Sequence, residues 1–297
     1  MASAAAETLL HGLVDYAGLF PPAALPMAQA VRLYDEYRRG AHAWILGRFV
    51  LPVARLEEFV RHAAPLFGRG VPWRLSVVGG ADDRETIERF NEKFGERAVI
   101  DALEGKAATV DEVGQHAALA ALRTPQDEPF FVFVEVPIAE DTAALVSAIG
   151  ANGLRAKVRT GGVTTEAFPA AVQLTRFLWS CATSDVAFKA TAGLHHPMRG
   201  DYRLTYESGS PQATMFGFLN VFLAACFLRA GLSEDRVVAV LEERDPKAFE
   251  FEPGRVLWGG HQLDAHSIDA LRERFATSFG SCSFAEPVQE LISMELL

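Results

Sequence analysis

The chain has 297 residues, of which 49% are hydrophobic and 22% are charged, and its formal net charge is −10. These numbers predict a well-buried globular protein, either one large α/β barrel or two smaller domains. The acidic balance, with no run of Lys or Arg, argues against nucleic acid or an acidic membrane surface as a partner. Its three cysteines are widely spaced, which argues against a disulfide framework and favours a reducing cytoplasm.

Neither the N-terminal segment nor the most apolar run of the chain indicates a membrane protein. The opening segment MASAAAETLLHG has no basic region and no long apolar stretch, so we expect no signal peptide. The most apolar run, Met215 to Leu228, contains Asn220 and is too short to span a bilayer, so a buried helix is predicted there. Its aromatic stripe suits either a helix core or a subunit contact. The second interpretation predicts a homodimer.

Strand-like and helical segments alternate over the first two thirds of the chain. The expected strands are LVDYAGLF (13–20), AWILGRFVLP (43–52), WRLSVVGG (73–80), RAVIDALEG (97–105), PFFVFVEVPI (129–138), LRAKVRTGG (154–162) and VAFKATAGL (186–194). The expected helices are 27–39, 53–67, 81–95, 109–123, about 141–150 and about 164–182. Most of the strands are continuous apolar runs, which is typical of a parallel sheet covered by helices.

The alternation changes after residue 196. The segments expected there are a polar loop at 197–211, helices at about 212–230 and 233–244, a β-hairpin around Pro253-Gly254, a helix at 266–276 and an eighth strand in TSFGSCSF (277–284). The prediction is one TIM-type (β/α)8 barrel domain over 1–297, with a mostly helical insertion at about 197–265. An open doubly wound sheet is the alternative, but no GxGxxG follows the first strand.

Two of the expected strands carry a lysine within an apolar run: Lys157 and Lys189. A lysine in a buried strand is unusual, because desolvation disfavours the ammonium form. Two lysines in successive strands could lie close together and lower each other's pKa, which makes a nucleophilic amine near neutral pH. The pattern predicts an imine-forming enzyme. The alternative is a structural role, in ion pairs with Asp101 or Glu135 that hold the barrel interior together.

A series of short motifs, in matching order along the chain, resembles the deoxyribose-phosphate aldolases and their class I aldolase relatives. DYAGLF has Asp15 where that family has an aspartate at the end of its first strand. WILGRFVLPVAR, which includes Arg48, is similar to the second strand and its turn. VIDALEG resembles the strand with the essential aspartate, here Asp101, and FVFVEV resembles the strand with a glutamate, here Glu135.

The most specific of these motifs contain the two lysines. KVRTG (157–161) has the K-x-x-T-G pattern of the family's Schiff-base strand, and FKATAGL (188–194) resembles the strand of its second active-site lysine. FGSCS (279–283) is similar to the end of the family's last strand. Together the motifs cover the barrel but leave out the segment 197–265.

The resemblance implies a lyase that forms or breaks a C–C bond through an imine between Lys157 and a small aldehyde or keto acid. Lys189 would keep Lys157 partly neutral, and Asp101, with Asp15, would move protons through a water molecule. No cofactor and no metal is expected. The residues expected to hold the substrate are Arg48, Glu135, Thr160, Gly161, Gly162, Gly193, His195, Gly280, Ser281 and Ser283.

The chain departs from the family at its phosphate site. Gly162 and His195 stand where the family has a lysine and an arginine, Ala192-Gly193 replaces a glycine pair, and Cys282 replaces a serine. A different aldehyde or keto acid is therefore expected rather than deoxyribose phosphate. Two other functions remain open: a metal-dependent barrel lyase or isomerase that uses His195 with the carboxylates of Glu135 and Asp101, and a non-catalytic barrel that acts as a binding or assembly subunit.

Overall fold

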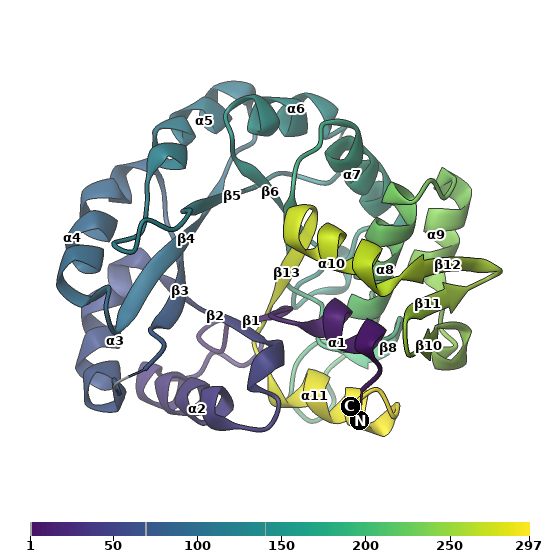
Figure 1. The fold of residues 1–297 in the computed structure, drawn as a ribbon, viewed down its shortest axis with the longest axis horizontal. Coiled ribbons are helices and arrows are strands. Elements are labelled where there is room, and N and C mark those ends of the chain that lie inside the picture. The colour runs from purple at the N-terminus through teal and green to yellow at the C-terminus, as the bar shows by residue number, and fades with distance from the viewer. Residues whose placement is uncertain (1, 69, 140) are drawn as a thin grey trace.

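The computed structural model describes residues 2–68, 70–139 and 141–297, and in them eight parallel strands close a barrel surrounded by helices (Figure 1). The predicted (β/α)8 barrel is confirmed. The barrel strands are β1 (Val14–Tyr16), β2 (Leu46–Pro52), β3 (Trp73–Val78), β4 (Ala98–Lys106), β5 (Phe131–Glu135), β6 (Arg155–Arg159), β7 (Phe188–Thr191) and β13 (Ala276–Ser281). Each pairs with the next barrel strand along the chain, and β13 closes the barrel against β1.

The helices after β1 to β6 form the outer layer of the barrel (Figure 1). They are α2 (Met27–Arg39), α3 (Leu56–Ala63), α4 (Arg84–Phe94), α5 (Val110–Gln115), α6 (Ala143–Ala151) and α7 (Ala171–Thr183). Before β1, α1 (Ala4–Leu10) packs against α10 (Ala265–Arg274), and α11 (Ala285–Ser293) follows the last strand. This arrangement leaves the C-terminal ends of the strands, where TIM-barrel active sites lie, next to the loops that lead into the helices.

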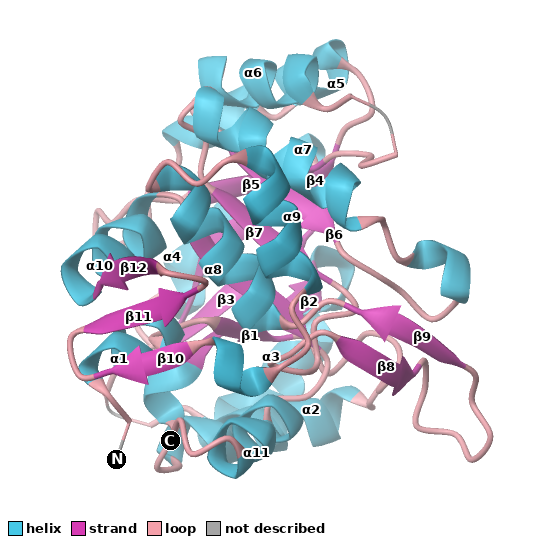
Figure 2. Cartoon of the chain, turned by 90° about the vertical axis from the view of Figure 1, so that its right-hand side faces the viewer, coloured by secondary structure: helices cyan, strands magenta, loops and turns pink. Residues whose placement is uncertain are grey.

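The segment between β7 and β13 differs from the prediction, because it is not mostly helical. It contains five short strands: β8 (Gly200–Arg203), β9 (Gln212–Met215), β10 (Glu250–Glu252), β11 (Arg255–Trp258) and β12 (His261–Asp264). The expected polar loop at 197–211 holds β8, which pairs with β9 as an antiparallel hairpin. The hairpin expected around Pro253-Gly254 is confirmed as β10 and β11, and β12 extends it to three strands. In Figure 1 the two small sheets lie on the same flank of the barrel, and Figure 2, which faces that flank, shows β10–β12 at one end of it and β8–β9 at the other.

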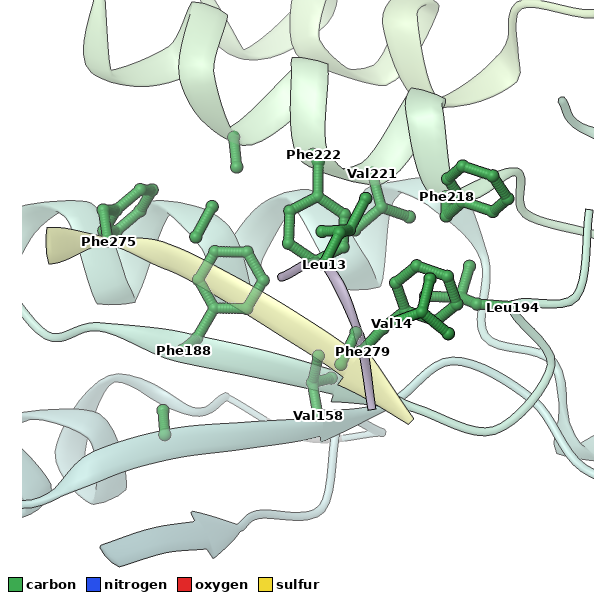
Figure 3. Close-up of a cluster of buried hydrophobic side chains, with 14 of the residues drawn as sticks. Leu13, Val14, Val158, Phe188, Leu194, Phe218, Val221, Phe222, Phe275 and Phe279 are labelled. Carbon is green, nitrogen blue, oxygen red and sulfur yellow. The ribbon is translucent and has the colours of Figure 1, made fainter. Parts of the chain in front are cut away.

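The helix α8 (Phe218–Arg229) belongs to the barrel layer rather than to an insertion. The rings of Phe218 and Phe222 lie 5.0 and 6.0 Å, between centroids, from the ring of Phe279 on β13 (Figure 3). The following helix α9 (Glu234–Glu242) packs on α8 as well. All side chains from Phe218 to Leu228 are buried, which explains why this helix is apolar on every side. Since the chain itself buries α8, the helix gives no support to the expected dimer contact.

Candidate functional site

The two lysines and Glu135 lie side by side in the barrel. Glu135 on β5 is the register partner of Lys157 on β6, and Lys157 is the register partner of Lys189 on β7. Register partners on parallel strands direct their side chains to the same face of a sheet. The exposed fraction of the side chain is 6% for Lys157 and 0% for Lys189. The structure thus brings together, inside the barrel, the two lysines that the sequence singled out.

Glu104 on β4 lies between the two ammonium groups and binds both. Its Oε2 is 2.9 Å from Nζ of Lys157, and its Oε1 accepts hydrogen bonds from Nζ of Lys189 at 2.6 Å and from the hydroxyl of Ser76 at 2.7 Å. Glu104 was not among the residues predicted from the sequence, because the aldolase resemblance placed the carboxylate of this strand at Asp101. The signal was present, because Glu104 is a second carboxylate in the same apolar run, VIDALEG.

Each lysine also has a carboxylate partner of its own. Nζ of Lys157 lies 3.0 Å from Oε2 of Glu135, and Nζ of Lys189 donates a hydrogen bond to Oδ2 of Asp15 at 2.7 Å. Carboxylates and ammonium groups therefore alternate across the barrel interior, with Glu104 at the centre. Alternation of this kind compensates each buried charge on both sides, which a buried ion needs in order to stay charged.

Lys157 is charged in the resting protein. Burial alone would lower the pKa of Lys157, but the carboxylates of Glu104 and Glu135 raise it above the ordinary lysine value. Burial likewise would raise the pKa of Glu104, but the two lysines lower it well below its usual range. The expectation that Lys189 keeps Lys157 partly neutral is therefore wrong, because a carboxylate lies between the two cations and outweighs their repulsion.

Asp101 has a different set of partners. Nε of Arg48 donates to Oδ1 of Asp101 at 2.6 Å, and Nη2 of Arg48 donates to Oδ2 at 2.9 Å. Nε of Arg74 also donates to Oδ2, at 2.7 Å. Burial would raise the pKa of Asp101, but the two guanidinium groups hold it below its usual value. Both oxygens are held by arginines, so this geometry fits an orienting ion pair rather than the expected proton transfer, and Arg48 pairs with a carboxylate rather than facing a substrate.

The glycines expected at the substrate site join the loops that follow the two lysine strands. A Cβ atom on Gly161 would lie 2.9 Å from the Cα atom of Gly193, and Gly193 has a φ of +73°, which favours glycine. The hydroxyl of Thr160 donates a hydrogen bond to the carbonyl of Ala192 at 2.6 Å, and the half-buried Gly162 continues this loop. The close approach of the two loop backbones explains why glycine occupies positions 161 and 193, whether or not a ligand binds there.

The remaining expected binding residues lie at the C-terminal ends of β7 and β13. Nδ1 of His195 is 3.5 Å from Oγ of Ser281 and 3.8 Å from Sγ of Cys282. Burial lowers the pKa of His195 to about 4, so its imidazole is neutral at physiological pH. Gly280 is buried in β13, and the hydroxyl of Ser283 accepts a backbone N–H from the first turn of α11. Ser283 thus has a helix-capping role.

The three metal ligands of the alternative function do not come together. His195 contacts β13, Glu135 binds Lys157, and Asp101 binds Arg48. These are three separate sets of partners. The structure therefore excludes the metal site that combined His195 with Glu135 and Asp101.

Two adjoining cavities lie at the C-terminal ends of the strands beside the lysines. One, of about 650 Å³, is lined by Glu135, Lys106 and Arg159 among others, and the second, of about 680 Å³, is lined by Glu104 and Lys106. Nε of Arg159 donates to Oε1 of Glu135 at 3.2 Å, and Nζ of Lys106 lies 3.8 Å from the same oxygen. Because Glu135 also binds Lys157, this carboxylate connects the buried amine to the first cavity.

No protein-family model matches this chain, and no curated protein matches it. Across the part of the chain that the structure describes, no helix combines the length and the apolar character needed to cross a membrane. A function for this chain is therefore inferred from the barrel fold and from the charged network around Lys157 and Lys189.

Proposed function

We propose that this protein is a class I aldolase-type lyase in which Lys157 forms an imine with a small aldehyde or keto acid. The observation that carries the proposal is the position of Lys157. Its buried ammonium group lies between Glu104 and Glu135, and Glu135 lines a cavity at the end of the barrel where TIM-barrel active sites lie. The resemblance to the deoxyribose-phosphate aldolases agrees with this role of Lys157.

The first requirement of the reaction is a neutral amine. Lys157 has two carboxylates within 3.0 Å, and a proton passed from its Nζ to Glu135 leaves a free electron pair on the nitrogen. Glu104 also binds Lys189, whereas Glu135 lines the cavity, so Glu135 is the carboxylate placed to accept this proton. Substrate entering next to Glu135 would displace water and favour the proton transfer.

The imine then makes cleavage of a C–C bond possible, because it can accept the electron pair of that bond. The amine attacks the carbonyl carbon, the carbinolamine loses water, and the protonated imine accepts the electron pair of the bond between the α and β carbons as that bond breaks to give an enamine. Protonation of the enamine at its α carbon and hydrolysis of the imine by water then release the product and the lysine. Glu135 returns its proton during loss of water and takes one up from the hydroxyl group of the leaving fragment. Arg159 and Lys106 at the cavity suit a substrate that carries an acidic group as well as a carbonyl.

Borohydride trapping tests the proposal. The protein is incubated with a panel of small aldehydes and 2-keto acids, reduced with borohydride, digested and examined by peptide mass spectrometry. We expect one reduced adduct on Lys157, which Lys157→Met and Lys157→Arg both abolish. The arginine variant keeps the charge between the two glutamates, so it separates loss of the amine from loss of the fold.

Lys247→Met is the matched control, because Lys247 is exposed and far along the chain from the barrel lysines. It is expected to leave the adduct unchanged. An adduct on Lys189 would mean that the roles of the two lysines are exchanged. If no carbonyl compound gives a site-specific adduct, the proposal is wrong, and the charge network is a structural feature of a barrel with another function.

A further inference from the structure

A second polar site lies on the same end of the barrel, where the loops after β1, β7 and β13 meet. A cavity of about 300 Å³ is lined there by Pro22, His195, His196, Tyr202, Tyr206 and Glu286, with further residues between Tyr202 and Tyr206. None of these residues belongs to the lysine network. The lining offers two imidazoles, one carboxylate and two phenol oxygens that can bind a cation, and it also contains the guanidinium group of Arg203.

Three metal-binding side chains converge at this cavity. One ligand atom each from His196, Glu286 and Glu290 lies within 4.8 Å of the other two. Glu286 and Glu290 are one turn apart on α11, so their carboxylates project from the same face of the helix. Nδ1 of His196 is already 2.6 Å from Oε1 of Glu290. Two elements that are distant in the sequence thus bring one nitrogen and two carboxylate donors together.

Neighbouring aromatic side chains hold two of these donors in place. The ring of His196 stacks on Tyr202, with 3.5 Å between the centroids and 11° between the planes, and its side chain is 12% exposed. The hydroxyl of Tyr206 donates a hydrogen bond to Oε2 of Glu286 at 3.1 Å. Partners of this kind orient the ligands of metal sites.

The charge at this cluster is not balanced by basic side chains. Within residues 2–68, 70–139 and 141–297, neither Glu286 nor Glu290 has a Lys or Arg nitrogen within ion-pair distance. Two carboxylates one helical turn apart repel each other. The cluster is therefore a half-buried anionic position at which a bound cation would be stabilised.

We propose that His196, Glu286 and Glu290 bind one divalent transition-metal ion of the Zn²⁺ class. One imidazole and two carboxylates suit such an ion, whereas Mg²⁺ and Ca²⁺ prefer oxygen donors alone. Three protein ligands leave an open coordination position for water or for an oxygen atom of a small ligand in the cavity. The site is independent of the imine chemistry, because no residue is shared with the lysine network.

Calorimetric titration of the full chain with ZnCl₂, after treatment with a chelator and dialysis, tests this inference. We expect one Zn²⁺ per chain, with clearly weaker binding of Mg²⁺. His196→Asn, Glu286→Gln and Glu290→Gln are each expected to weaken Zn²⁺ binding by about tenfold or more, since each removes a direct ligand. The exposed pair His261→Asn and Glu234→Gln are the matched controls and are expected to bind as the wild type does.

Thermal unfolding of the same proteins gives a second measurement. Zn²⁺ should raise the Tm of the wild type and of both controls, because a ligand that binds only the folded state stabilises it. At the same Zn²⁺ concentration, the rise in the Tm of Glu290→Gln should be clearly smaller. Should His196→Asn fail to fold, the two glutamine variants on α11 still decide the outcome. Zn²⁺ binding of equal strength in the wild type and the glutamine variants would overturn the proposal, and so would no binding to the wild type.

Discussion

Lys157 and Lys189 are register partners on neighbouring strands, yet their ammonium groups are bridged by one carboxylate, that of Glu104. This relationship decides how the barrel interior carries its charge. The lysines do not act on each other directly, because each is bound to Glu104 and to one further carboxylate. The charged side chains of this network thus come from five strands, namely β1, β4, β5, β6 and β7.

Glu104→Gln should be strongly destabilising. The amide cannot compensate two buried ammonium groups, and breaking a buried ion pair in this way typically costs about 3 to 5 kcal/mol. The free energy of unfolding, measured by urea titration at pH 7, should fall by that order. Glu92→Gln, at an exposed position on α4, should behave as the wild type. A Glu104→Gln protein as stable as the wild type would show that the network contributes little.

The same carboxylate predicts the acid response of the fold. The lysines lower the pKa of Glu104 in the folded state, whereas in the unfolded chain it is about 4.3. Its contribution is therefore complete above about pH 4.3 and is lost as the pH falls toward the folded pKa. Urea titrations from pH 7 to pH 3 should show the gap between wild type and Glu104→Gln narrowing only below about pH 5. A constant gap would contradict this assignment.

Glu135→Gln should shift the pH dependence of imine trapping, if Lys157 is the imine lysine. Glu135 is one of the two carboxylates that raise the pKa of Lys157. Without its charge, the neutral amine should form at lower pH, so the yield of borohydride adduct on Lys157 should reach its midpoint at lower pH than in the wild type. The maximal yield is compared separately, because Glu135 also carries protons in the proposed reaction. A midpoint that stays in place or rises would count against this electrostatic role.

Gly161→Ala should loosen the connection between the two lysine strands. The added methyl group would lie 2.9 Å from the Cα atom of Gly193 and closer still to the ring of Phe168. Overpacking of this kind costs about 1 to 3 kcal/mol. The matched control is Gly254→Ala, where the added atom meets nothing within 4 Å. Urea titration of both variants gives the comparison, and equal stabilities would show that the loops can shift to make room.

Much of the barrel could be predicted because its strands are buried on both sides. A continuous apolar run bounded by glycine is a strong strand signal, and a lysine inside one, as at Lys157 and Lys189, is visible without a structure. The partner of the lysines could not be chosen in the same way. Strand β4 has one residue more than β3 near Asp101, so the side-chain direction of Glu104 cannot be counted from the start of the strand.

The segment after β7 was predicted less well, also for physical reasons. Strand β8 alternates between half-buried and exposed positions, so polar residues can occupy both of its faces and its sequence resembles that of a loop. The apolar helix α8 suggested a subunit contact because its sequence does not show which elements cover it. The cluster of His196 with Glu286 and Glu290 was invisible for another reason, since about ninety positions separate its two parts.

The alternating charges inside the barrel also have a consequence for synthesis of the chain. The ribosome makes Asp15, Glu104 and Glu135 first, and both lysines only afterwards. Three carboxylates without their cations would be costly to remove from water, so a nascent chain that ends before Lys157 should keep this interior open and hydrated. Packing of strands β1 and β4 to β6 around this interior should therefore wait until Lys189 has left the exit tunnel, before β13 emerges and closes the barrel against β1.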